Sequence, residues 1–149
     1  ERTPVGEDNP AVWKDVIEVN LLGTYYCSRQ ALPHLKTSRG KIINVGSGMG
    51  HQARATNSSY NAAKAGVWML TRCMAMQLCD EGVAVNELNP GPVATELTKD
   101  AFQAGVPHPQ MGSEWIKQPE DVVPLAMLMM TQPEKGATGQ CFSIARRPL

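Results

Sequence analysis

The order of apolar and polar positions predicts a long helix near the start of the chain. Between Pro10 and about Lys36, apolar residues recur every three or four positions in two stripes, which predicts a helix buried on two sides. The stripes contain Val12, Val16, Val19, Gly23 and Tyr26 on one line, and Ile17, Leu21 and Leu32 on the other. We expect Pro33 to kink or fray the last turn.

Three short apolar runs predict strands. Lys41–Val45 is nearly continuous, as is typical of a strand covered on both faces, and the glycine-rich loop Gly46–Gly50 follows it. Val83–Leu88 predicts a second strand, which ends at the turn residues 89–92, and Gln140–Ile144 predicts a third.

Two further helices are expected between these strands. Ser58 or Ser59 can cap a helix that runs to about Asp80, and Pro119 suits the first turn of a helix through Met130. Residues 96–117 have mixed character with two glycines and two prolines, which indicates a flexible flap over the substrate.

Strands separated by helices predict an α/β fold with a parallel sheet, in a single domain over residues 1–149. In such sheets ligands bind beyond the carboxyl ends of the strands. Three features fall there: Ser47 with its neighbouring glycines, the turn at Pro90 and Gly91, and the start of the helix that contains Tyr60. This edge is the expected site.

Composition limits the classes of partner. The 149 residues are 42% apolar, as in an ordinary globular domain, and 14 basic residues balance 14 acidic ones. Neither sign of charge forms a block, so nothing favours a nucleic acid or a membrane surface as the partner. A small molecule is the favoured partner. Without an apolar run of about 20 residues or a targeting segment, we expect a soluble cytoplasmic protein.

The cysteines and histidines give no sign of a metal site. No CxxC pair or Cys/His cluster occurs, so we expect buried, reduced thiols, with metal, disulfide or redox roles left as alternatives. The residues concerned are Cys27, Cys73, Cys79 and Cys141, with His34, His51 and His108 scattered among them.

Tyr60 and Lys64 share one face of the predicted helix because they are four residues apart. A tyrosine has a pKa of about 10, and a neighbouring ammonium favours the phenolate and lowers it. Such a phenol can give a proton to a carbonyl oxygen or take one from an alcohol. The pair alone fits an ordinary solvated helix face better than a reaction centre. Ser47, thirteen residues before Tyr60 on the glycine loop, makes a reaction centre the better reading.

These residues resemble the short-chain dehydrogenase/reductase family. The similarity is carried in order by Asn20 in EVNLLGTYY, Ser47 in KIINVGSGMG, Tyr60 and Lys64 in SYNAAKAG, and NPGPVATEL from Asn89. The resemblance implies a Rossmann-type doubly wound parallel sheet. It also implies hydride transfer between NAD or NADP and an alcohol or carbonyl compound.

The resemblance assigns a role to each matching residue. Tyr60 corresponds to the general acid/base, and Lys64 to the group that lowers its pKa and binds the nicotinamide ribose. Ser47 corresponds to the residue that holds the substrate oxygen. Asn20 corresponds to the one that keeps a water for proton relay, although a buried helix amide bonded to backbone is the alternative.

Four residues after the second strand correspond to cofactor contacts in the family. Pro90 and Gly91 would bring the backbone close to the nicotinamide, and Val93 and Thr95 would contact its carboxamide or the phosphates. A plain strand-to-loop turn is the alternative for this segment. Candidate apolar walls for the substrate, with simple packing as the alternative, are Phe102, Met111 and Trp115.

The sequence also departs from the family. The TGxxxGxG turn and the NNAG stretch of the family's N-terminal half do not occur here, so we expect the C-terminal catalytic half, with three strands and without most of the cofactor cradle. Such a chain would expose the edge of its first strand and an apolar helix face. Glu87 stands in the second strand where the family prefers small or apolar residues.

Two hypotheses follow for the whole protein. One is an NAD(P)-dependent oxidoreductase that forms a homodimer or homotetramer at full length, through the bundle that the Asn20 and Tyr60 helices make in the family. The alternative is a truncated, non-catalytic homologue that acts as an association or partner subunit. The complete set Asn20, Ser47, Tyr60 and Lys64 favours the first, and the missing glycine turn favours the second.

Overall fold

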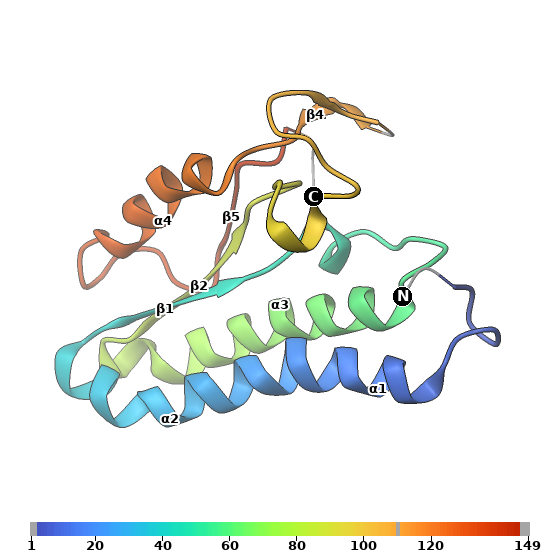
Figure 1. Ribbon diagram of the computed structural model, residues 1–149. Helices are drawn as coiled ribbons and strands as arrows, with labels where there is room; N and C mark the ends of the chain where they lie inside the picture. Colours follow the sequence, from blue (N-terminus) through green and yellow to red (C-terminus); the bar gives the residue numbers. More distant parts are fainter. Residues whose placement is uncertain (1–2, 110, 147–149) are drawn as a thin grey trace.

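A computed structural model describes residues 3–109 and 111–146. It has a three-stranded parallel sheet in the order β1-β2-β5, formed by Lys41–Val45, Ala84–Asn89 and Cys141–Ser143. Helices cover both faces, with α2 and α3 on one side and α4 on the other (Figure 1). The predicted doubly wound α/β arrangement with three parallel strands is therefore confirmed.

The register of the sheet decides which side chains meet. Asn44 of β1 pairs with Glu87 of β2, which in turn pairs with Cys141 of β5. Partners in register point to the same face of a sheet, so these three side chains lie on one face. β1 has β2 as its only partner among the described strands, which leaves its other edge free, as expected.

The first helix is a continuous helical run with a change of geometry in its middle. It consists of α1 (Pro10–Ile17), a π-helical segment (Glu18–Leu22) and α2 (Gly23–Ser38). Pro33 lies inside α2, which continues to Ser38, so the predicted fraying at Pro33 is wrong. The missing N–H of a proline removes one hydrogen bond, which the neighbouring turns tolerate. Arg39, with φ 51°, ends the helix.

The helix that contains Tyr60 is α3 (Ser58–Leu78), followed by a 3₁₀ turn (Cys79–Glu81). Its N-cap is Asn57 in the left-handed region, so the predicted serine cap is wrong. Ser58 instead accepts a hydrogen bond at Oγ from Trp13 Nε1 at 3.0 Å, which joins α1 to the start of α3. The predicted end near Asp80 is confirmed, since α3 and its 3₁₀ turn are closed by Gly82 with a left-handed φ of 73°.

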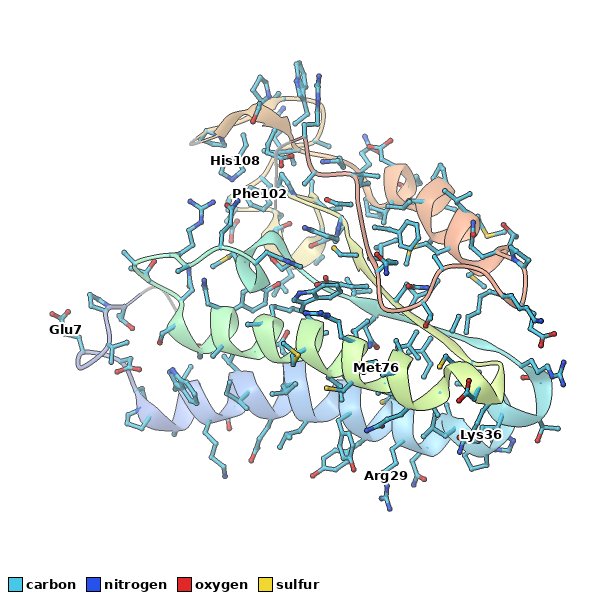
Figure 2. All side chains as sticks on the ribbon, turned by 180° about the vertical axis from the view of Figure 1, so that it is seen from behind. Glu7, Arg29, Lys36, Met76, Phe102 and His108 are labelled. Atoms are coloured by element: carbon cyan, nitrogen blue, oxygen red, sulfur yellow. The ribbon has the colours of Figure 1, made fainter. Side chains whose placement is uncertain are left out.

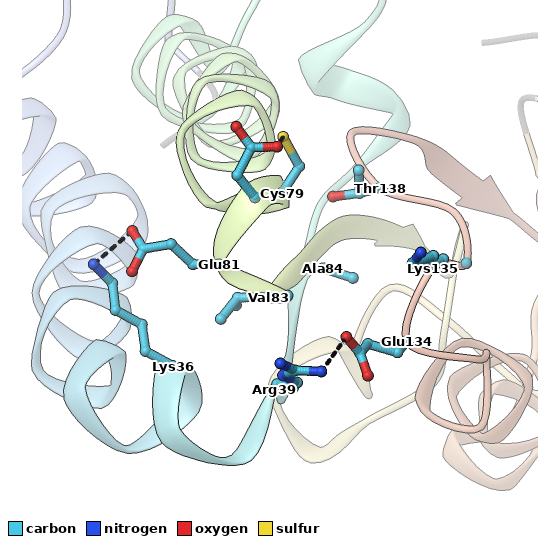
Figure 3. A pocket seen from close by; sticks show the side chains of 12 residues that line it. Lys36, Arg39, Cys79, Glu81, Val83, Ala84, Glu134, Lys135 and Thr138 are labelled. Carbon is cyan, nitrogen blue, oxygen red and sulfur yellow. Dashed lines mark hydrogen bonds and ion pairs between the residues drawn. The ribbon is translucent and has the colours of Figure 1, made fainter.

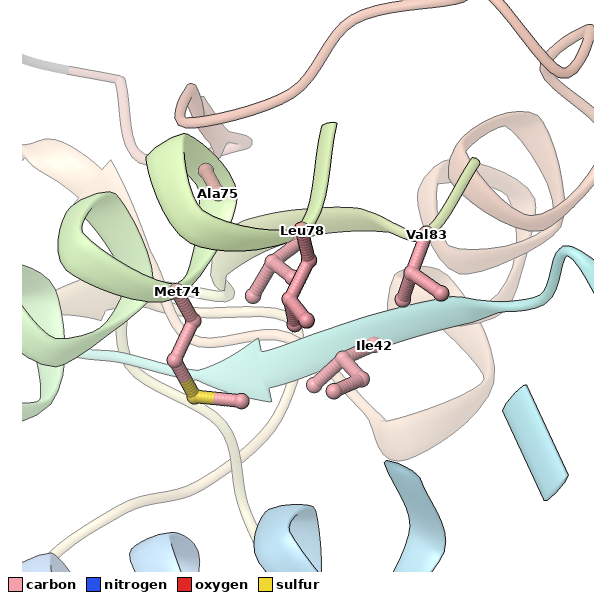
Figure 4. Close-up of a cluster of buried hydrophobic side chains, with 6 residues drawn as sticks. Ile42, Met74, Ala75, Leu78 and Val83 are labelled. Atoms are coloured by element: carbon pink, nitrogen blue, oxygen red, sulfur yellow. The ribbon is translucent and has the colours of Figure 1, made fainter. Parts of the chain in front are cut away.

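The apolar core lies between α3 and the sheet (Figure 4). It contains Ile42, Met74, Ala75, Leu78, Val83 and Val85. Each fully buried aliphatic side chain contributes about 1.5–3 kcal/mol. A buried hydrogen bond of 2.9 Å, from Asn44 Nδ2 to Thr71 Oγ1, adds a polar tie between the sheet and the same helix. Together these contacts fix α3, and with it Tyr60, relative to the carboxyl ends of the strands.

The other face of β1 is less covered than expected. α4 (Val123–Met130), preceded by a 3₁₀ turn from Pro119, packs on this face. Val45 is nevertheless 57% exposed. The prediction of burial on both faces is therefore wrong at the end of β1, because α4 does not reach that far.

The expected burial of the cysteines is wrong for three of them. Cys27, Cys73 and Cys79 are exposed, and Cys141 is half-buried. Apolar neighbours in sequence point to other sides of a helix, so they do not bury the thiol beside them. All four are free thiols, as expected.

The expected flap has more regular structure than its sequence indicates. A 3₁₀ turn (Glu96–Thr98) is followed by an antiparallel pair, β3 (Pro107–His108) and β4 (Met111–Trp115). Phe102 and His108 meet edge to face, with ring centroids 5.4 Å apart, at one end of the molecule (Figure 2). None of the helices in the described part of the chain is both long enough and apolar enough to span a membrane.

Candidate active site

Ser47 is held at the carboxyl end of β1, beside the end of β2. The N–H of Gly46 donates to Leu88 O at 2.9 Å, which keeps this loop against the second strand. Ser47 Oγ accepts from the N–H of Met49 at 3.1 Å and so caps a 3₁₀ turn (Gly48–Gly50). The hydroxyl therefore has a fixed position at the edge where ligands of α/β sheets bind.

Ser47, Tyr60 and Lys64 come together at this edge. The hydroxyl of Ser47 lies close enough to the phenol of Tyr60 to lower its pKa. Lys64 Nζ lies 5.5 Å from the centroid of the Tyr60 ring and donates to Val45 O at 3.0 Å. Gly50 permits this approach, since a Cβ there would lie 2.7 Å from the carbonyl carbon of Lys64. The loop and the helix thus bring the predicted pair and the predicted serine into one site.

The pKa of Tyr60 moves opposite to the expected direction. Burial disfavours the phenolate and raises the pKa, and the Ser47 hydroxyl lowers it only in part. The expected net lowering of the Tyr60 pKa is therefore wrong for this structure, because burial outweighs the group that lowers it. Like an ordinary tyrosine, Tyr60 is a neutral phenol at neutral pH and can donate a proton.

Lys64 is also affected by burial, which lowers the pKa of its ammonium. The negative charge of Glu87 acts in the opposite direction and raises it. Glu87 lies on β2, so the strand that departs from the family pattern contributes charge to this site.

Asn20 lies in the π-helical segment, a geometry often found at functional sites. Its Nδ2 donates to Val16 O at 3.0 Å, and its backbone carbonyl accepts from Thr24 Oγ1 at 2.8 Å. Asn20 and Lys64 both line a surface hollow of about 630 Å³ along the free edge of β1. The fold thus brings Asn20 to the same hollow as Lys64, although its amide is bonded to backbone.

The turn after β2 contains a glycine in a backbone conformation that other residues rarely adopt. Gly91 has φ 67°, and its N–H donates to Asn89 Oδ1 at 3.1 Å. A Cβ at Gly91 would meet Lys117 Nζ at 3.2 Å. The positive φ disfavours any residue with a Cβ, so the backbone of this turn carries no side chain of its own, as the expected approach of a cofactor would need.

Val93 and Thr95 are held by contacts within their own loop. Val93 forms an isolated parallel bridge with Lys117, and its carbonyl accepts from Thr98 Oγ1 at 2.8 Å. Thr95 and Thr98 cap each other's backbone around the 3₁₀ turn. These contacts hold in place the loop that follows Gly91.

The three candidate wall residues differ in their surroundings. Phe102 contacts His108, as described above, and Trp115 is 42% exposed. The side chain of Met111 lies outside the described set.

Sequence reasoning missed a polar cluster beneath the Ser47 loop. Glu87 is completely buried, and its Oε2 lies 2.8 Å from His51 Nε2. Burial, together with a hydrogen bond to Glu87 and the charge of Glu87, raises the pKa of the Cys141 thiol to about 12. The sequence signal was an acidic residue in a mostly apolar strand prediction, but the histidine lies 36 residues away in sequence and could not be paired with it.

A second hollow, of about 700 Å³, lies at the opposite end of the sheet, around Val83 and Ala84 at the start of β2 (Figure 3). Four of its charged side chains form two ion pairs. Lys36 binds Glu81 at 2.7 Å and Arg39 binds Glu134 at 2.8 Å. It contains none of the predicted site residues, so the edge with Ser47 and Tyr60 is the candidate site.

Known proteins resemble this chain over most of its length. Residues 1–105 match the family described as short chain dehydrogenase. The chain is 38% identical over 119 residues to cis-4-hydroxycyclohexanecarboxylate dehydrogenase of Sinomonas cyclohexanicum, a match that covers 79% of this chain and 46% of that protein. It is 33% identical over 138 residues to a 3-oxoacyl-(acyl-carrier-protein) reductase of Synechocystis sp., covering 89% and 54%.

A solved structure extends the similarity to the fold. A 3-oxoacyl-(acyl-carrier-protein) reductase from Brucella melitensis, with bound NAD, matches with a TM-score of 0.79 and 28% identity, over 97% of this chain and 54% of that chain. The chain spans about half the length of the curated relatives it matches. From the sequence match and the shared fold, the chain belongs to the short-chain dehydrogenase family.

Proposed function

We propose that this chain carries the proton-transfer residues of an oxidoreductase that moves hydride between NAD or NADP and an alcohol or ketone. The observation that carries the proposal is the convergence of three side chains at the carboxyl edge of the sheet: the Ser47 hydroxyl lies close enough to the Tyr60 phenol to act on its pKa, and Lys64 lies beside the same ring. A solvated helix face has no need of this buried arrangement. The dehydrogenase and reductase relatives support the same class of reaction.

The residues of the site fit the nicotinamide end of such a cofactor. Tyr60 and Lys64 would hold the ribose hydroxyls, and the backbone at Pro90 and Gly91 would lie against the ring. Val93 and Thr95 would contact the carboxamide or the phosphates. When bound, the nicotinamide supplies or accepts the hydride, and the protein contributes orientation and proton handling.

In the reduction direction, Tyr60 donates its phenolic proton to the substrate carbonyl oxygen as negative charge develops there. Ser47 donates a hydrogen bond to the same oxygen, which stabilises that charge in a site with little water. Burial keeps the phenol protonated at neutral pH, so the proton donor is ready before substrate arrives. Lys64 and Asn20 would connect Tyr60 to solvent through a water that the amide holds.

Turnover tests this proposal. The protein would be expressed from its whole reading frame and assayed for NADH and NADPH oxidation with a panel of ketones. Tyr60→Phe should abolish turnover while the circular dichroism spectrum stays unchanged, and Tyr26→Phe, on an exposed part of α2, should be as active as the wild type. Full turnover by Tyr60→Phe would refute the assignment.

The alternative of a non-catalytic association subunit is favoured by a separate observation. The edge of β1 is free, and the neighbouring helix exposes Val19 to 73% and Tyr26 to 55%. Titration of NADH and NADPH against the protein separates the two: no binding at millimolar nucleotide supports this alternative. A homodimer or homotetramer and a cytoplasmic location are our expectations for an active enzyme of this family.

A further inference from the structure

We propose that His51, Glu87 and Cys141 form a binding site for a thiophilic divalent cation, Zn²⁺ being the best fit. The three residues come from the loop after β1, from β2 and from the start of β5. Their donor atoms, an imidazole nitrogen, a carboxylate oxygen and a sulfur, all lie within 4.8 Å of one another. The site contains none of the residues proposed for hydride transfer, although the charge of Glu87 acts on Lys64.

The spacing of the donors suits one ion. Zn²⁺ binds nitrogen, oxygen and sulfur at about 2.0–2.3 Å, which places neighbouring donors about 3.3–3.7 Å apart. The distance from His51 Nε2 to Glu87 Oε2 is 2.8 Å, below that range, and the upper limit for the cluster is 4.8 Å. A small opening of the histidine–glutamate pair therefore brings the three donors to coordination distance.

The buried carboxylate gives a second reason to expect a ligand. Glu87 has 0% exposure, and its Oε1 has no hydrogen-bond partner among the described residues. A buried carboxyl oxygen without a hydrogen-bond partner is costly, and a cation beside it removes that cost. A carboxylate and a thiolate also supply two negative charges, which balance a divalent ion.

A metal ion can reach the three donors, and their chemistry suits Zn²⁺. The side chain of His51 is 12% exposed and Cys141 is half-buried, so an ion can enter without unfolding. On binding, the S–H bond of Cys141 breaks, a sulfur–metal bond forms, and the proton passes to water. Mixed N, O and S donors favour Zn²⁺ over Mg²⁺ or Ca²⁺, which prefer oxygen alone.

Cobalt titration tests the site, because Co²⁺ replaces Zn²⁺ and a cobalt–thiolate bond absorbs in the near ultraviolet. We expect one Co²⁺ per chain with this absorption in chelator-treated wild-type protein, and displacement by Zn²⁺. Cys141→Ser and His51→Gln should each weaken binding by about 100-fold or more, since even groups that only orient metal ligands change affinity by about 10- to 100-fold. The exposed residues Cys79 and His34 provide matched controls: Cys79→Ser and His34→Gln should bind as the wild type does.

Two measurements keep the test independent of variant folding. Zn²⁺ should protect Cys141, but not the three exposed cysteines, from alkylation in wild-type protein, as read by peptide mass spectrometry. Co²⁺ should also quench Trp68, whose ring centroid lies 5.1 Å from that of His51, and Trp68→Phe should remove that quenching. Absence of one-to-one binding, binding retained by both ligand variants, or unprotected Cys141 at saturating Zn²⁺ would overturn the proposal.

Discussion

Gly46 is the position where the structure predicts the sharpest effect of a single methyl group. A Cβ at Gly46 would lie 1.6 Å from Glu87 Oε1, 2.3 Å from Cδ and 2.5 Å from Cγ. Real Cβ contacts do not fall below 3.0 Å, so the carboxylate would have to move by more than 1 Å. Gly46 is not among the glycines with positive φ, so its backbone conformation alone accepts alanine. Any loss of stability in Gly46→Ala therefore comes from Glu87.

The size of the effect follows from what Glu87 would lose. Its side chain is completely buried and bound to His51 at 2.8 Å, so it has no solvent to move into. Overpacking a core costs about 1–3 kcal/mol, and leaving a buried polar group without its hydrogen bond costs about 1–3 kcal/mol. We expect Gly46→Ala to lower the free energy of unfolding by about 3 kcal/mol, a large part of the 5–15 kcal/mol typical of a domain.

Urea unfolding of four proteins measures this coupling: wild type, Gly46→Ala, Glu87→Ala and the double variant. Glu87→Ala removes all three clashing atoms, so adding Gly46→Ala to it should change stability by less than about 1 kcal/mol. Gly112→Ala, where an added Cβ has open space, should stay within about 0.5 kcal/mol of the wild type. Equal losses from Gly46→Ala with and without Glu87 would refute the reasoning.

Three further predictions rest on single groups. Burial raises the pKa of Tyr60, so the contribution of its neutral phenol to stability is complete below pH 10 and is lost as pH rises through the higher folded-state pKa. In a difference titration of wild type against Tyr60→Phe, phenolate absorbance should appear only above pH 10. Its appearance below pH 9 would contradict this prediction. At pH 8 an aromatic disulfide reagent should label three cysteines quickly and Cys141, with a pKa of about 12, slowly; four equal rates would count against the raised pKa. Thr71→Val should cost about 1–3 kcal/mol in urea unfolding, because it leaves the buried amide of Asn44 without its acceptor, and an unchanged midpoint would show that this bond is unimportant.

The elements that the sequence predicted best were those with local signals. β1 matches its predicted bounds, and β2, β5 and the end of α3 lie within a residue or two of theirs. Tyr60 and Ser47 could be placed in one site because a helix spacing and a loop at a strand end both follow from chain geometry.

Features that depend on contacts between distant segments could not be predicted. The prediction of a serine cap for α3 was wrong because the hydroxyl of Ser58 accepts a hydrogen bond from Trp13, 45 residues away. The prediction of a lowered Tyr60 pKa was wrong because the pKa depends on how deeply the ring is buried, which a spacing of four residues does not reveal. Glu87 looked like a departure from the family, and only the fold shows that His51 is its partner.

The central claim is that Tyr60 delivers the proton and does not merely hold the helix or the cofactor. The most direct test is a single-turnover measurement of NADH or NADPH oxidation at saturating ketone, together with the nucleotide Kd, for wild type and Tyr60→Phe. We predict a rate loss of about 100-fold or more, as expected for removal of a general acid, with the Kd changed by less than tenfold. A Tyr60→Phe rate within tenfold of the wild type, at equal nucleotide occupancy, would contradict the account.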